Sequence, residues 1–330
     1  MNYNKTGMLG CAALLMGAVA ASLVHAAQPA PAQACDRNCL LQLADTYLAA
    51  VVAHDPSKAP LAPDVKFVEQ VKRIKPGEGL WKAATGAPNP DFKVVVPDVA
   101  AQQVAGILMM QSDNKPMQLG FRLKLVNGKI TEAEHLLAAP RDTSMPNLTR
   151  LRPAILLDVP YEYADSRGRM LHIAKSYYDA LDNNNGHLAP FAADCERHEN
   201  GMRTAPSGGP SLAGPAIPGQ PPRPPSLLGM QSCTSQMDSN TFEYITSLDN
   251  RRIMIADEKT GLAVGFSQFR HPMTQKDYRI LNDPGRDKTS MSFAPFDLPA
   301  MHIFKIWGGE IHDIEAMGFQ APLNSPSGWE

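Results

Sequence analysis

The chain has almost no net charge and, beyond its N-terminus, no long hydrophobic run. Its 31 Lys and Arg residues nearly balance 33 Asp and Glu residues, which gives a formal net charge of −2. We therefore expect neither nucleic acid nor an anionic membrane as an obligate partner. After residue 24 no stretch approaches the roughly 18 apolar residues that a spanning helix needs, so no membrane partner is expected.

Motifs for nucleotide, serine-hydrolase and metal chemistry are also missing. The stretch 265–269 (GFSQF) lacks the second glycine of a nucleophile elbow, 77–79 (GEG) lacks the third glycine of a dinucleotide loop, and no phosphate loop is present. The run at 196–199 (ERHE) matches no metal-ligand spacing. The sequence thus predicts no cofactor and no metal.

Residues 1–26 have the pattern of a secretory signal peptide. Lys5 lies in a short leading region, an apolar run extends from Met8 to Val24, and Ala26 precedes Ala27 at the expected cleavage site. Residues 27–34 (AQPAPAQA) are predicted to be a disordered leader. The mature protein is therefore expected to be secreted or periplasmic.

Four cysteines follow the signal peptide, an even number in an exported chain. Pairing Cys35 with Cys39 and Cys195 with Cys233 gives one disulfide in each region, although four cysteines allow three connectivities. A zinc site is the competing interpretation, but no Cys-x-x-Cys or His-x-x-x-His accompanies these cysteines.

Two stretches, 121–136 (FRLKLVNGKITEAEHL) and 302–317 (HIFKIWGGEIHDIEAM), share one design. In each, an apolar run is interrupted by Asn-Gly or Gly-Gly and then resumes, which is a strong signal for a β-hairpin. Two-residue turns would place opposed residues on one face by simple reflection. The predicted pairs are Phe121 with Glu134, Leu123 with Glu132, Phe304 with Asp313, and His302 with Glu315. These carboxylates should then lie beside apolar side chains, buried or lining a cavity.

The hairpins belong to a longer repeat. A helical apolar period that includes Tyr47 returns around Tyr177, and each helix is followed by Leu-Ala-Pro and then by Glu69 or Glu199. Antiparallel strands are expected between helix and hairpin in both copies.

These repeats predict a first domain at 35–139, a Pro-rich connector at 140–168 and a second domain at 169–330. The second copy also holds a Pro-rich loop at 205–225 and a polar insertion at 273–293. Long loops of this kind are usually lids, binding loops or disordered segments.

The helix, Leu-Ala-Pro, glutamate and terminal hairpin resemble the nuclear transport factor 2-like, or SnoaL-like, cone fold. The stretches 35–40 (CDRNCL), 79–81 (GLW) and 199–201 (ENG) are also similar to an uncharacterised family of secreted bacterial and fungal proteins with tandem copies of that fold. The resemblance implies an α+β protein of two tandem cystatin-like cone domains, each with a helix packed on a curved mixed or antiparallel sheet. It implies an apolar pocket in each cone and an internal pseudo-dimer, with a homo-oligomer as a further option.

The second copy holds the sharpest candidate for catalysis. A histidine beside a carboxylate in an apolar pocket suits general acid–base chemistry without a cofactor. A structural cross-strand pair is the alternative interpretation. The predicted catalytic residues are His302, Glu315 and Glu199. The predicted substrate-binding residues are His312, His271, Tyr177, Phe304, Glu69 and Glu134.

In the first copy, Glu69, Glu132 and Glu134 could form a carboxylate cluster that shares a proton. His135 falls on the opposite parity of its strand and is expected at the interface between the copies. Core packing is the default expectation for the large aromatic residues Tyr47, Tyr177, Trp81 and Trp307.

We therefore expect a cofactor-independent lyase, dehydratase or isomerase acting on a small apolar or aromatic oxygenated molecule. The enzyme members of the cone-fold superfamily have Tyr-plus-Asp or Asp-Arg-Asp signatures that find no match here, so fold alone does not fix the function. The competing hypothesis is a noncatalytic secreted module that binds a small ligand or another protein.

Overall fold

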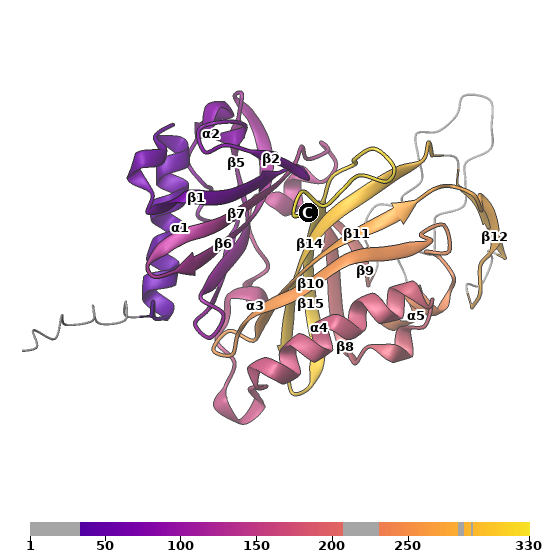
Figure 1. Ribbon diagram of the computed structural model, residues 1–330. Helices are drawn as coiled ribbons and strands as arrows, with labels where there is room; N and C mark the ends of the chain where they lie inside the picture. Colours follow the sequence, from indigo (N-terminus) through magenta and orange to yellow (C-terminus); the bar gives the residue numbers. More distant parts are fainter. Residues whose placement is uncertain (1–33, 207–230, 283–286, 292) are drawn as a thin grey trace, which may run out of the picture. The chain divides into compact units, whose positions relative to one another are not determined.

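The structure is a computed structural model that describes residues 34–206, 231–282, 287–291 and 293–330 (Figure 1). The predicted signal peptide, nearly all of the leader and most of the Pro-rich loop at 205–225 lie outside the described residues. Within the described part, no helix has the length and apolar character needed to cross a membrane.

The N-terminal half (34–139) combines one long helix with a seven-stranded sheet in the order β2-β1-β7-β6-β5-β3, in which β4 also pairs with β5. Its elements are α1 (Arg37–Val52), η1 (Pro56–Lys58), β1 (Leu61–Glu69), β2 (Lys72–Ile74), α2 (Leu80–Ala83), β3 (Ala84–Gly86), β4 (Lys93–Asp98), β5 (Gln103–Ser112), β6 (Lys115–Val126) and β7 (Lys129–Ala138).

A connector (140–166) leads to the C-terminal half (167–330), whose main sheet has six strands in the order β10-β11-β14-β15-β8-β9. The connector contains η2 (Met145–Leu148), α3 (Pro153–Leu156) and η3 (Tyr161–Tyr163). The C-terminal elements are α4 (Arg167–Asp182), η4 (Gly186–Leu188), β8 (Phe191–Glu199), β9 (Met202–Ala205), α5 (Cys233–Asp238), β10 (Ser247–Asp257), β11 (Leu262–His271), β12 (Asp277–Arg279), β13 (Lys288–Ser290), β14 (Phe296–Trp307) and β15 (Glu310–Gly318).

The two halves use one strand order. Read through β4, the first sheet runs β2-β1-β7-β6-β5-β4, and the second runs β9-β8-β15-β14-β11-β10. In both, only one neighbouring pair is parallel, β1 with β7 and β8 with β15. The protein is thus α+β with curved mixed sheets, as predicted. The insertion at 273–293 contributes β12 and β13, which pair with each other as a separate two-stranded sheet.

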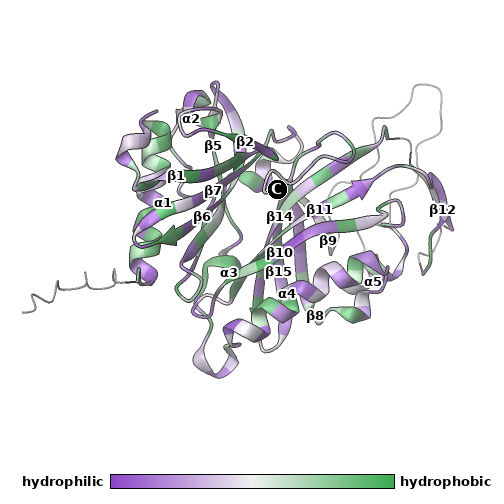
Figure 2. Ribbon diagram, viewed as in Figure 1, coloured by the Kyte–Doolittle hydropathy of each residue, from purple (hydrophilic) through white to green (hydrophobic). Residues whose placement is uncertain are grey.

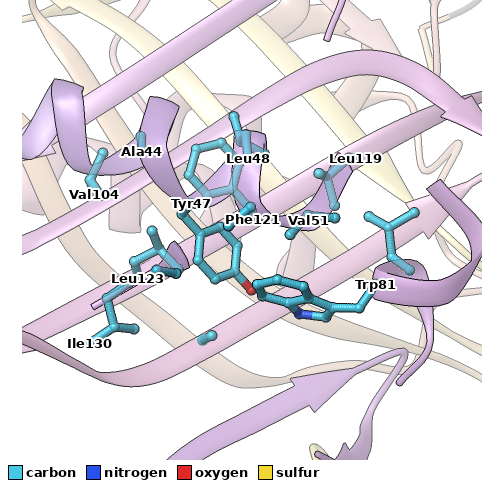
Figure 3. Packing of buried hydrophobic residues seen from close by; sticks show 14 of the residues in the cluster. Ala44, Tyr47, Leu48, Val51, Trp81, Val104, Leu119, Phe121, Leu123 and Ile130 are labelled. Atoms are coloured by element: carbon cyan, nitrogen blue, oxygen red, sulfur yellow. The ribbon is translucent and has the colours of Figure 1, made fainter. Parts of the chain in front are cut away.

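Each long helix begins at a side-chain cap and packs its apolar face on its sheet. Asp36 accepts a hydrogen bond from the Cys39 amide at the start of α1, and Ser166 accepts one from the Arg169 amide at the start of α4. Tyr47 of α1 is fully buried among residues of β5, β6 and β7 (Figure 3). Both helices also carry polar residues, which cover the remaining helix surface (Figure 2).

Both terminal hairpins have the predicted two-residue turns. Val126 pairs with Lys129 around Asn127-Gly128, and Trp307 pairs with Glu310 around Gly308-Gly309. All four turn residues have positive φ, as a type I′ turn requires. Beyond each turn, however, the register shifts by one residue, between Lys124 and Leu125 and between Lys305 and Ile306.

This shift makes the predicted cross-strand pairs wrong. Glu134 lies opposite Arg122 instead of Phe121, and Glu132 opposite Lys124. In the second hairpin His302 lies opposite Ala316, Glu315 opposite Ile303, and Asp313 opposite Lys305. Because neighbouring residues of a strand point to opposite faces, one extra residue moves every carboxylate to the other side of its sheet.

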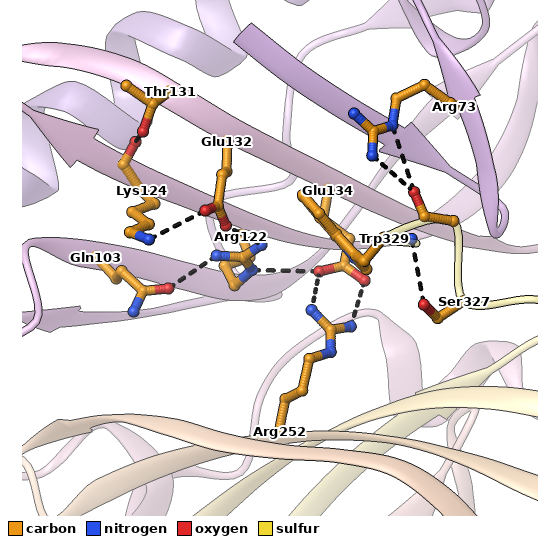
Figure 4. Close-up of polar contacts among 11 residues, drawn as sticks. Arg73, Gln103, Arg122, Lys124, Thr131, Glu132, Glu134, Arg252, Ser327 and Trp329 are labelled. Carbon is orange, nitrogen blue, oxygen red and sulfur yellow. Dashed lines mark hydrogen bonds and ion pairs between the residues drawn. The ribbon is translucent and has the colours of Figure 1, made fainter.

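The carboxylates therefore face outward and meet arginines. Glu134 is buried and accepts two hydrogen bonds from Arg252 of the C-terminal half, at 2.8 and 2.6 Å, and one from Arg122 at 3.2 Å (Figure 4). Although burial raises it, the charges of Arg252 and Arg122 hold the pKa of Glu134 below its usual range. Trp329 lies against Arg122, whose guanidinium carbon is 4.8 Å from the ring centre. A buried apolar cluster containing Val94 and Val264 also joins the halves.

The connector is fastened to the outer face of the second sheet in a similar way. Arg152 donates to Asp313 at 3.0 Å and to Glu315 at 2.9 Å. The second oxygen of Glu315 is buried and has no hydrogen-bond partner among the residues that the structure describes. Burial raises the pKa of Glu315 to about 7, against the opposing charge of Arg152. Glu315 therefore lacks the full set of partners that keeps Glu134 ionised.

The two predicted disulfides are present, Cys35–Cys39 and Cys195–Cys233. The second joins β8 to α5. Such bonds persist in oxidising compartments and indicate an extracytoplasmic environment.

We expect Glu315→Gln to flatten the pH dependence of stability. The folded state keeps the Glu315 proton up to a pKa of about 7, whereas the ordinary value is 4.5. Stability from this group is therefore complete below pH 4.5 and is lost as the pH rises to 7, a loss on the order of 2 to 3 kcal/mol. In urea unfolding, the free energy of unfolding should fall less between pH 5 and pH 8 in the variant than in the unmodified protein. An equal fall in both proteins would contradict the raised pKa of Glu315.

We also expect Arg252→Met to lower the free energy of unfolding by about 3 kcal/mol, because it removes one of the two arginines that balance the charge of the buried Glu134. Lys124→Met is the matched control, since Lys124 is more exposed and binds the outer carboxylate Glu132. The free energy of unfolding of this control should fall by less than about 1 kcal/mol. Equal losses in chemical denaturation would show that the Glu134 cluster is not what joins the halves.

Candidate functional site

The C-terminal half encloses a cavity of about 180 Å³ between α4 and the inner face of its sheet. Apolar walls come from Leu181, Phe269, Leu298 and Met317, and the segment 139–144 contributes to the lining from the connector side. A concave apolar space with few polar groups is the usual form of a small-molecule site.

Four of the predicted site residues line this one cavity: His302, Glu199, His271 and Tyr177. They come from β14, the end of β8, the end of β11 and α4. Residues up to 125 positions apart in the chain thus converge, because β8 lies beside β15 and α4 packs across the inner face of the sheet.

Glu199 is the carboxylate of the cavity. It lies 3.2 Å from the Arg197 guanidinium, and its side chain is 39% exposed. Arg197 is buried, donates to the Thr204 hydroxyl at 2.9 Å and also donates to Gln236. Thr204 and Gln236 therefore fix the guanidinium beside Glu199, and Glu199 can reach the cavity while its charge stays balanced.

Both cavity histidines are neutral at physiological pH. Burial, together with the nearby Arg197, lowers the pKa of His302 to about 3. Burial lowers the pKa of His271 to about 4. The His271 Nδ1 atom is 3.2 Å from the Phe269 carbonyl and donates to it, which leaves Nε2 as an acceptor. His302 Nδ1 lies 3.1 Å from the Tyr178 hydroxyl.

Two tyrosines supply hydroxyl groups. Burial raises the pKa of Tyr177 to about 12, and the same cause raises the pKa of Tyr244 to about 12. Both phenols therefore keep their protons and can donate hydrogen bonds. Glu199, two neutral imidazoles and two protonated phenols can together accept a proton from a ligand and bind its oxygen atoms.

The remaining predicted residues lie elsewhere. Glu315 is on the outer face with Arg152, so the proposed His302–Glu315 pair does not exist. His312 is at the outer face too, stacked on Trp307 at a centroid distance of 3.6 Å and bound to Asp194. Phe304 is buried beside the cavity, with its ring 5.1 Å from that of Tyr177.

The predicted carboxylate cluster of the N-terminal half does not form. Glu134 and Glu132 bind Arg122 on the outer face, whereas Glu69 lies inside, 3.0 Å from His135 Nδ1. The other nitrogen of His135 lies 3.0 Å from the Tyr47 hydroxyl, so His135 is in the core and its predicted interface position is wrong. Trp81 packs edge-on against Tyr47 and is buried.

Sequence reasoning missed Tyr244, Arg141 and Asn200 as cavity residues. Tyr244 and Arg141 lie outside helices and strands, where no apolar period marks a buried face. Asn200 had a usable signal, because Asn200-Gly201 is a two-residue turn directly after Glu199, and its side chain binds the Gly318 backbone at 2.9 and 3.0 Å. Among the described residues, no group of three His, Cys, Asp or Glu side chains could hold a metal ion.

Comparisons with known proteins give little functional information. Residues 163–318 match a family described as "Domain of unknown function (DUF8021)", and no curated protein matches the chain. Among solved structures, the chain is similar to a candidate polyketide cyclase from Silicibacter sp. TM1040, with 13% identity, a TM-score of 0.26, and coverage of 46% of this chain and 88% of that one. It is also similar to AclR, a candidate hydroxylase from Streptomyces galilaeus, with 15% identity, a TM-score of 0.20, and coverage of 31% and 77%. At these TM-scores neither likeness carries an argument about this chain.

Proposed function

We propose that the cavity of the C-terminal half is the active site of a secreted or periplasmic, cofactor-independent acid–base enzyme. Its substrate would be a small apolar or aromatic oxygenated molecule, and the reaction a lyase, dehydratase or isomerase step. The observation that carries this proposal is the convergence of Glu199, the two cavity histidines and two protonated phenols on one apolar-walled cavity.

In this mechanism Glu199 accepts a proton from a carbon or oxygen atom of the substrate. Arg197 balances the carboxylate charge before the transfer. Tyr177 and Tyr244 donate hydrogen bonds to the oxygen on which negative charge develops, because both phenols stay protonated. His302 and His271 bind the substrate as neutral groups. Glu315 has no part in this scheme, since it lies on the other face of the sheet.

The alternative is a noncatalytic module that binds a small ligand in the same cavity. The observation that favours it is the Arg197–Glu199 pair at 3.2 Å, in which the carboxylate already has a partner. Such a pair could fix the orientation of a ligand without any proton transfer.

We further propose that the two halves are tandem domains, 35–139 and 169–330, that form an internal pseudo-dimer with the first as a scaffold. The shared strand order and the Glu134–Arg252 bonds between the halves support this arrangement. The two disulfides support export.

Glu199→Gln should abolish turnover while the fold is retained, because an amide cannot accept the proton. The protein, residues 27–330, is incubated with a metabolite extract of the source organism, and mass spectrometry follows the loss of each species. Glu310→Gln, on the exposed first residue of β15, is the matched control and should act like the unmodified protein. The contrary outcome is that the unmodified protein and both variants leave every metabolite unchanged but retain the same small molecule after desalting. The binding-module alternative then holds.

Ala316→Phe should block the cavity. Ala316 lines it opposite His302, and a phenyl ring would occupy much of the 180 Å³. We expect at least tenfold weaker ligand retention or turnover with little loss of secondary structure by circular dichroism. Full activity in a folded Ala316→Phe protein would place the site elsewhere.

A further inference from the structure

Exposed apolar side chains are concentrated in the connector. Of the nine large hydrophobic side chains that are exposed in the described residues, four lie within eight positions: Leu156, Leu157, Tyr161 and Tyr163. Leu157 is 64% exposed and Tyr161 is 94% exposed. Single exposed apolar residues are ordinary on a protein surface, but a contiguous group marks an interaction site.

This part of the connector forms one wall of a groove of about 810 Å³ on the outer face of the second sheet. Leu157, Pro160 and Tyr163 lie along that wall. Opposite them, Trp307 and His312 stack with an interplanar angle of 6°, and Tyr163 meets Trp307 edge-on at 5.9 Å. The groove and the cavity described above are on opposite faces of the same sheet, because Trp307 and Asp313 line the first while His302 and Ala316 line the second.

The lining of the groove holds more carboxylates than cations. Its two cations and four carboxylates, 2 − 4 = −2 with histidine left out of the count, are Arg152, Lys305, Asp158, Asp194, Glu196 and Asp313. Both cations have partners within the protein, since Arg152 binds Asp313 and Lys305 donates to the Leu157 and Thr260 carbonyls. Three of the carboxylates pair with an arginine or a lysine: Asp313 and Glu196 with Arg152, and Asp158 with Lys259. Asp194 instead pairs with His312 and remains the carboxylate that a basic ligand can reach. Asp194 is 68% exposed at the rim, so a ligand meets negative charge first.

We propose that this groove docks an extended, proline-containing segment of a partner protein that carries a basic residue. Proline-rich segments adopt the polyproline II conformation before they bind, and grooves lined by aromatic side chains recognise them. Tyr163 and Trp307 offer such a lining, and Asp194 offers a partner for the basic residue. The negative lining disfavours an anionic membrane as the occupant.

The test uses a fluorescent synthetic peptide of Pro-Pro-Arg repeats and measures its anisotropy with the full chain. Trp307→Ala and Tyr163→Ala should each weaken binding at least tenfold, because aromatic side chains dominate such contacts. Asp194→Asn should weaken it about threefold and reduce its dependence on salt. Phe293→Ala is the matched control, since Phe293 is an exposed aromatic side chain that does not line the groove, and the affinity of this variant should stay within twofold.

Three results would overturn the proposal. A Gly-Ser-Arg peptide of equal charge that binds as well would mean that attraction is purely electrostatic. Binding that survives in both folded aromatic variants would place the peptide elsewhere. Binding that appears only after deletion of residues 207–230 would mean that this chain's own proline-rich stretch is the occupant. None of these results depends on turnover in the cavity, so failure here leaves the proposed enzyme activity standing.

Discussion

One extra residue beyond the turn of each terminal hairpin decides what the two faces of both sheets carry. The register shifts at the same place in β6–β7 and in β14–β15. Because strand side chains alternate, this shift turns His135 and His302 toward the helices and Glu134 and Glu315 away from them. The inward faces gain histidine–tyrosine contacts. The outward faces gain buried carboxylates, which are stable only where guanidinium groups reach them.

Those outward carboxylates explain how the parts of the chain are held together. Glu134 has two arginines, one from each half, and remains ionised. Within the described part of the chain, Arg152 of the connector binds one oxygen of Glu315 and no group binds the other, and burial raises the pKa of Glu315 to about 7. Both side chains are almost fully buried, so the surrounding charges separate the two pKa values. Two arginines lower the pKa of Glu134, whereas the charges of Asp313 and Glu196 oppose the effect of Arg152 on Glu315.

The helices and turns of this fold were predictable from local patterns in the sequence. The face of the sheet on which each site residue lies was not. Asn-Gly and Gly-Gly fix the turns, because these residues tolerate positive φ, and the apolar periods around Tyr47 and Tyr177 fix the helices. A bulge shifts the phase of the alternation by one residue, but Lys129 and Ile130 are the two residues of β7 that precede it, and so short a run does not reveal the shift. The His302–Glu315 pair failed for that reason. Glu199 and Tyr177 reached the cavity because their placement depends on a strand end and a helix face, which the register shift does not alter.

The glutamates that end β1 and β8 differ in accessibility, and this difference supports the proposed site in the C-terminal half. At the end of β1, Glu69 is capped by His135 and by the Leu80 amide, and a Cβ added at Gly79 would lie 2.0 Å from its oxygen. Neighbouring residues of the N-terminal half thus bury the Glu69 carboxylate. At the end of β8, Glu199 has Arg197 at its side and open cavity in front. A carboxylate must be reachable to exchange a proton with a ligand, and of these two glutamates Glu199 meets that requirement whereas the enclosed Glu69 does not.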